Sequence, residues 1–103
     1  MLKHCVFLAV RPDAMAGLPE TMALLSGLKA KVPGMVDFAH GPNRDFEGLS
    51  AGYAYGFVIS FTDRSAHLAY ERHPDHVAAG AALVAACQGG IAGIMVVDLE
   101  VAV

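Results

Sequence analysis

The chain has 103 residues, of which 55% are hydrophobic and 17% charged, and its formal net charge is −3 at pH 7. This length supplies one hydrophobic core, so we expect a single domain over residues 1–103. Only seven Lys and Arg residues are present, without a basic run, which argues against nucleic-acid binding. No run approaches the ~20 apolar residues of a membrane-spanning helix, so we expect no membrane insertion.

The amino-terminal residues lead directly into an apolar run without the pattern of a signal peptide. Cys5 and Cys87 are too few for a disulfide framework, so we expect buried thiols in a cytoplasmic protein. Residues 3–10 predict a strand, because they are β-branched, aromatic and apolar and end before Pro12. Both alternating faces of this strand are apolar, which indicates that both faces are covered.

Residues 15–31 predict an amphipathic helix. Its apolar stripe has helical spacing and consists of Met22, Leu25, Leu28 and Val32. The turn Val32-Pro33-Gly34 ends the helix, and Pro19 is tolerable only in its first turn.

Residues 35–40 predict a second strand, with Val36, Phe38 and His40 on one face and Met35, Asp37 and Ala39 on the other. A polar loop over 44–52 follows it. Residues 53–61 show the clearest alternation of the chain and predict a third strand. The residues on one face of that strand are Tyr53, Tyr55, Phe57, Ile59 and Phe61.

Thr62-Asp63 is a plausible helix N-cap, and it begins a short helix that ends near His73 because Pro74 follows. Residues 75–88 predict another, Ala-rich helix, and residues 91–101 a last strand. The order is strand, helix, strand, strand, helix, helix, strand. It favours an α+β fold of the ferredoxin-like kind, a four-stranded antiparallel sheet with helices on one face.

Such a sheet leaves its other face open, and the first strand has apolar side chains on both faces. A second copy related by a two-fold axis would cover the open face and form a shared barrel. At ~25 cal/mol per Å² of apolar surface buried, several hundred Å² would contribute many kcal/mol before the costs of association. We therefore expect a homodimer that forms through the open sheet face.

The segment from Tyr70 to His76 concentrates proton-handling groups around the bend at Pro74. Near the start of a helix, His76 would stay neutral and could remove a proton next to a carbonyl group. Tyr70 could donate a hydrogen bond to the carbonyl oxygen as enolate charge develops. His4, beside Val6 on the first strand, could orient either residue.

Each of these residues also has a purely structural interpretation. His76 could cap or pack, His73 could cap the end of the preceding helix, and Tyr70 could simply fill space. His40 and His67 are expected at the periphery, and Asp37 and Asp98 are expected to form interface hydrogen bonds. The stripe with Tyr53 and Phe57 either packs against the sheet or lines a cavity.

We expect no metal site and no cofactor. His73 and His76 are three residues apart, but the proline between them spoils the helical geometry that would align the pair. No Glu or Cys completes a recognisable ligand set around them.

Several motifs together resemble the stress-responsive A/B barrel (Dabb) domain family over essentially the whole chain. They are Lys3-His4, Val32-Pro33-Gly34, Gly41-Pro42-Asn43, Gly52-Tyr53, Phe61-Thr62-Asp63, Tyr70-x-x-His73-Pro74-x-His76 and Val96-Val97-Asp98. The resemblance implies a ferredoxin-like subunit that dimerises into an α/β barrel. Many members have no assigned reaction.

One enzyme of that family, a plant cyclase, closes a polyketide chain by an aldol-type condensation without metal or organic cofactor. The resemblance places its catalytic tyrosine and histidine at Tyr70 and His76, and its pocket histidines at His4 and His73. The small residues Ala78, Ala79, Ala81 and Ala82 depart from that enzyme's pocket, so the substrate does not transfer.

Three functional hypotheses follow. The first is a dimer that binds a small apolar or aromatic carbonyl compound and performs acid/base chemistry with Tyr70 and His76, with His4, His73, Tyr53 and Phe57 contacting the ligand. The second is the same dimer acting without catalysis, as a stress-associated structural or ligand-binding protein. The third, monooxygenase-type chemistry, has no specific support. The first requires that His4, Tyr70 and His76 share one cavity.

Overall fold

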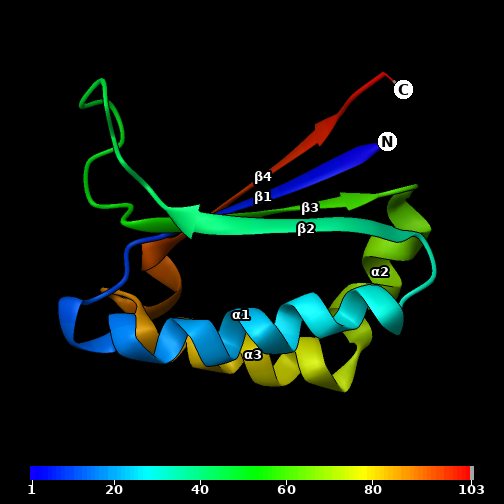
Figure 1. Cartoon of the computed structure of the whole chain (residues 1–103), viewed down its shortest axis with the longest axis horizontal. Coiled ribbons are helices and arrows are strands. Elements are labelled where there is room, and N and C mark those ends of the chain that lie inside the picture. Colours follow the sequence, from blue (N-terminus) through cyan, green and yellow to red (C-terminus); the bar gives the residue numbers. More distant parts are fainter. Residues whose placement is uncertain (103) are drawn as a thin grey trace.

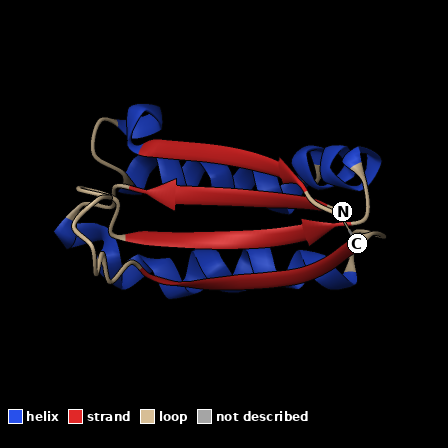
Figure 2. Cartoon of the chain, turned by 90° about the horizontal axis from the view of Figure 1, so that it is seen from above, coloured by secondary structure: helices blue, strands red, loops and turns tan. Residues whose placement is uncertain are grey.

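The computed structural model describes residues 1–102 as a four-stranded sheet with helices packed against one face (Figure 1). The strands are β1 (Leu2–Leu8), β2 (Met35–Pro42), β3 (Tyr55–Phe61) and β4 (Ile94–Glu100). Their spatial order is β2-β3-β1-β4, and every neighbouring pair is antiparallel (Figure 2). The predicted ferredoxin-like α+β fold is confirmed.

The predicted first helix is divided into three segments. They are the 3₁₀ helix η1 (Pro12–Gly17), α1 (Leu18–Gly27) and the 3₁₀ helix η2 (Leu28–Ala30). Pro19 lies in the first turn of α1, where its missing N–H costs no helical hydrogen bond. The predicted apolar stripe from Met22 to Val32 is buried, as expected.

The other helices are α2 (Arg64–Arg72), α3 (Pro74–Ala86) and the 3₁₀ helix η3 (Gly90–Gly93). Asp63 caps α2 as predicted, since its carboxylate accepts a hydrogen bond of 2.9 Å from the Ala66 N–H. Helices α1 and α3 lie side by side under the sheet (Figure 1). Among the described residues, no helix is both long and apolar enough to span a bilayer.

A β-bulge corrects the predicted faces of β2. The pairing with β3 shifts between Met35 and Asp37, so one extra residue enters β2 at that point. The bulge reverses the alternation, and Met35 and Phe38 therefore both pack on the helix side, while Val36 is exposed. We expected Met35 and Phe38 on opposite faces, because simple alternation takes no account of a bulge.

The two faces of the sheet differ in what packs against them. Register places His4, Val6 and Leu8 of β1 on the helix side, where they are buried. Their neighbours in the strand face the open side together with exposed apolar residues of β4, which are Met95, Val97 and Leu99. The loop between β2 and β3 rises on this open side, opposite α1 and α3 (Figure 1), and its Phe46 and Leu49 are highly exposed.

Candidate functional site

A cavity of about 650 Å³ lies on the helix side of β1 and β4, bordered by α2 and α3. Its apolar wall includes Val6, Leu25, Phe57, Leu83, Ile94 and Val96. Its polar groups come from separate elements, and they include His4 from β1, Asp98 from β4, Tyr70 from α2 and His76 from α3. The three side chains that the acid/base hypothesis requires, His4, Tyr70 and His76, therefore share one cavity.

The bend at Pro74 brings Tyr70 and His76 together. His73 is extended at that point, as a residue before proline prefers, and α3 restarts in a new direction. The ring centroids of Tyr70 and His76 lie 4.5 Å apart. Tyr70 is only 1% exposed, and burial raises the pKa of its phenol well above the usual range, which keeps it protonated at neutral pH.

The ring of His76 has a defined tautomer. Its Nδ1 lies 3.0 Å from the main-chain oxygen of Glu71. A carbonyl oxygen only accepts hydrogen bonds, so Nδ1 carries the proton and Nε2 is left as the basic atom. Burial lowers the pKa of His76, while the contacts with Glu71 oppose this shift. The neutral imidazole that we expected is thus supported, although burial rather than the helix dipole is the leading cause.

His4 and Asp98 form a hydrogen-bonded pair on neighbouring strands. Register sets them directly opposite each other, and His4 Nδ1 lies 2.6 Å from Asp98 Oδ1. Because a carboxylate accepts, the imidazole donates. Asp98, for which we expected an interface hydrogen bond, has His4 of its own chain as its hydrogen-bond partner in this structure.

His67 is the residue that sequence reasoning missed. We expected it at the periphery, but it is 2% exposed and its ring centroid lies 4.5 Å from that of His4. Arg64 donates a hydrogen bond to its Nδ1, and burial lowers the pKa of its imidazole. The spacing His67-x-x-Tyr70 on a predicted helix was the available signal, because residues three apart share a helix face.

Two of the predicted ligand contacts lie outside this cavity. His73 caps the start of α3, because its Nδ1 accepts a hydrogen bond of 3.0 Å from the Asp75 N–H. As expected, His73 also ends α2, where its N–H donates a hydrogen bond of 3.2 Å to the Tyr70 carbonyl oxygen. Tyr53 precedes β3 and lines a separate hollow of about 480 Å³, which Phe57 also borders. The remaining histidine, His40, is exposed as expected and bonds to the Tyr55 hydroxyl.

Residues 2–101 match the model of the stress responsive A/B barrel domain. The chain belongs to this family. The tyrosine-to-histidine segment that suggested the relationship is the same segment that forms the bend between α2 and α3. A comparison with curated proteins found no match.

Solved structures give the same fold. A dimeric ferredoxin-like protein of unknown function from Jannaschia sp. CCS1 is 51% identical, with a TM-score of 0.93 over 97% of this chain and 98% of that chain. An Arabidopsis thaliana protein is 20% identical, with a TM-score of 0.83 over 100% of this chain and 97% of its own. A hydroxynitrile lyase from Passiflora edulis is 15% identical, with a TM-score of 0.80 over 98% and 93%. At this low identity the last two show the fold alone.

Proposed function

We propose that this A/B barrel domain protein binds a small apolar or aromatic carbonyl compound in the cavity and catalyses proton transfer at the carbon beside the carbonyl. The observation that carries the proposal is the 4.5 Å approach of the Tyr70 and His76 rings inside a cavity that His4 also lines. Enolisation requires at least an acid and a base, and this apolar cavity holds one of each close together.

The proposed step divides between two side chains. His76 Nε2 takes a proton from the carbon beside the carbonyl, and the electron pair of that C–H bond moves into an enolate. The Tyr70 hydroxyl donates a hydrogen bond to the carbonyl oxygen, where negative charge grows. Because the Tyr70 phenol is buried with a raised pKa, it stabilises the enolate by hydrogen bonding and keeps its own proton. Return of the proton from His76 to carbon completes an isomerisation or an exchange.

His4 and Asp98 act as positioning residues in this scheme. The 2.6 Å hydrogen bond fixes the His4 ring, whose centroid lies 5.9 Å from that of Tyr70 in an edge-on arrangement. His4 therefore forms part of the wall against which Tyr70 and the ligand are held. A fixed wall limits the orientations that a bound carbonyl compound can adopt.

The size and lining of the cavity set the ligand class. A volume of about 650 Å³ lies within the range of small-molecule sites. The wall is mainly aliphatic and aromatic, and Gly80 adds no side chain that would narrow it. Among the described residues that line the cavity, only Arg64, Glu71 and Asp98 carry charged side chains. These features favour a compact, largely apolar ligand with one or two carbonyl oxygens.

Dimer formation through the open sheet face belongs to the same proposal. The exposed Met95, Val97 and Leu99 form an apolar row on β4. The 51% identical relative is described as dimeric. Two copies packed on these faces would bury the row and leave the two cavities on the outer, helix-covered sides.

The test uses exchange of carbon-bound protons, which requires no knowledge of the natural substrate. A panel of aryl methyl ketones and 1,3-diketones is incubated with the protein in D₂O, and NMR follows loss of the proton beside the carbonyl. We expect the protein to exchange this proton faster than buffer alone. His76→Ala should abolish this enhancement, and His73→Ala, which alters a residue outside the cavity, should retain it. Binding of panel compounds without exchange would favour the non-catalytic alternative and contradict the enzymatic proposal.

A further inference from the structure

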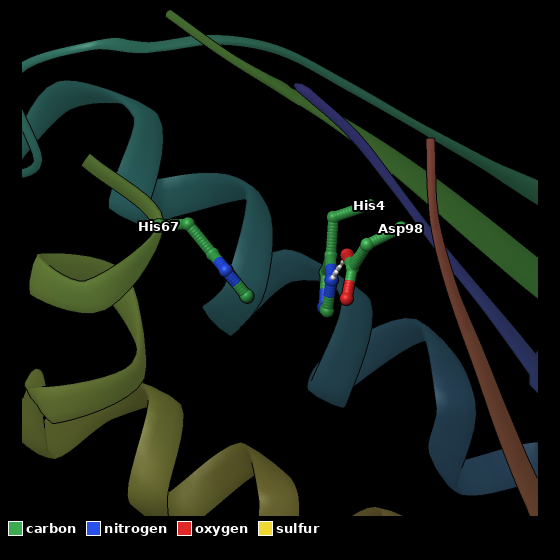
Figure 3. Close-up of side chains that lie close together, drawn as sticks. All are labelled: His4, His67 and Asp98. Carbon is green, nitrogen blue, oxygen red and sulfur yellow. Dashed lines mark hydrogen bonds and ion pairs between the residues drawn. The ribbon is translucent and has the colours of Figure 1, made fainter. Parts of the chain in front are cut away.

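We infer that His4, His67 and Asp98 form a binding site for one divalent first-row transition metal ion, such as Zn²⁺. The three residues come from β1, α2 and β4, and each offers one ligand atom, all within 4.8 Å of one another. Figure 3 shows His4 and Asp98 side by side below the sheet, with His67 directed toward them from α2. This inference stands on side-chain placement, and its test does not require that proton exchange be observed.

His67 supplies the observation that calls for a ligand. Its Nε2 is buried and has no hydrogen-bond partner among the described residues. Glu71 Oε1 is 3.1 Å away, but the two atoms are not aligned for a hydrogen bond. A buried polar atom without a partner is costly, and structures rarely tolerate one without a reason. A metal ion between His67 and the His4–Asp98 pair would satisfy this atom.

The donor set suits a zinc-like ion. Two imidazole nitrogens and one carboxylate oxygen are the ligands of many three-residue sites, which keep a fourth position for water or substrate. Ligand atoms around tetrahedral Zn²⁺ lie about 3.4 Å apart, given bonds of about 2.1 Å. The present separations are 2.6 Å between His4 Nδ1 and Asp98 Oδ1 and at most 4.8 Å among the three ligand atoms, so the pair has to open slightly and His67 has to approach it. Asp98 is on the edge strand β4 and its side chain is 40% exposed, so it has room to move.

Two contacts must change when the ion binds. The hydrogen bond between His4 and Asp98 gives way to bonds from both residues to the metal, and the His4 proton shifts to its other ring nitrogen. His67 must bind through Nε2 with its proton on Nδ1, so Arg64 has to release that nitrogen. The Arg64 side chain is 62% exposed and can turn into solvent at small cost. The Glu71 carboxylate beside Nε2 adds a favourable negative charge.

The experiment measures metal binding directly on untagged protein cleared of metal with a chelator. Zn²⁺ is titrated against a chromophoric competitor, and Co²⁺ is titrated while visible absorption is recorded. We expect one ion per chain and the intense visible bands of a four-coordinate Co²⁺ site. Asp98→Asn and His67→Gln should each weaken Zn²⁺ binding by at least about 100-fold, the upper end of what loss of an outer partner costs. His40→Gln, an exposed histidine outside the cavity, should bind like the unaltered chain.

A second measurement uses the unaltered chain, so that its result does not depend on whether the variants fold. Paramagnetic Co²⁺ should shift or broaden the imidazole NMR signals of His4 and His67 at one equivalent and leave those of His40 and His73 in place. Absence of saturable binding, or equal losses in His40→Gln and Asp98→Asn, would overturn the inference. Failure of proton exchange with intact metal binding would instead reject the proposed function alone, because metal binding is measured without any carbonyl ligand.

Discussion

The two faces of the sheet present different side chains from the same strands. On the helix side, His4 of β1 and Asp98 of β4 form a hydrogen-bonded pair inside a cavity with Tyr70 and His76. On the open side, the neighbouring positions of β4 are apolar and exposed. In the proposed scheme, one short strand lines the cavity through every second residue and forms the dimer interface through the others. The comparison also separates the two properties experimentally, because a substitution on one face need not disturb the other.

The largest expected effect is on catalysis. His76→Ala should lower the rate of exchange or turnover by about 10²–10⁴-fold, the usual contribution of a general base. The dimer should persist, because His76 lies on the helix side. Kinetics together with light scattering check both statements, and His73→Ala serves as the matched histidine control. Full activity in His76→Ala would contradict the assignment of the base.

Adjacent valines of β4 provide the sharpest comparison of the faces. Val97 faces the open side and Val96 the cavity. Val97→Asp should raise the dimer dissociation constant by about 100-fold or more, because two copies would bury unpaired carboxylates at the interface. Val96→Asp should leave the dimer intact and weaken binding of apolar ligands. Light scattering should give twice the chain mass of 10.8 kDa for the unaltered protein and for Val96→Asp.

Asp98→Asn should produce a moderate loss. The substitution removes the negative charge of the carboxylate that accepts the hydrogen bond from His4. Because hydrogen bonds to charged groups contribute about 1.5–3 kcal/mol, we expect the turnover rate to fall roughly tenfold or more. Asp37→Asn is the control, because register places Asp37 on the opposite face of the sheet. An equal loss in both variants would show that the His4–Asp98 hydrogen bond has no special role.

The smallest expected effect is on folding stability as a function of pH. The pKa of His76 is lowered in the folded protein, chiefly by burial. The unfolded chain therefore takes up protons first as the pH falls through about 6.5, and the stability that neutral His76 contributes is present above that pH and lost below it. Glu71 and His4 are the charged or titratable groups that act on it. Thermal melts of His76→Ala should show a weaker decline between pH 8 and pH 5 than those of the unaltered chain.

The sequence predicted the local features of this molecule well, because each has a local cause. Alternation marked the apolar face of β3, Asp63 marked the start of α2, and Pro74 marked the bend that joins Tyr70 to His76. The features it did not predict depend on pairing between distant segments. The bulge in β2 and the His4–Asp98 hydrogen bond both follow from strand register, which local patterns do not specify.

His67 illustrates the same limit within the site. Its helical spacing to Tyr70 was visible in the sequence, but its burial depends on how α2 packs against the His4 side of the sheet. Residues 4, 67 and 98 have no sequence proximity, so their clustering emerges only from the fold. Our expectation of no metal site considered His73 and His76, whereas the cluster that the fold assembles consists of other residues.

The most direct test of the central claim is a crystal structure with a bound aryl methyl ketone from the panel. The account predicts the ketone in the cavity between the sheet and α2–α3, with its carbonyl oxygen about 2.6–3.2 Å from the Tyr70 hydroxyl and its methyl group facing His76 Nε2. A ketone bound instead in the hollow beside Tyr53, with the Tyr70 cavity empty, would contradict it.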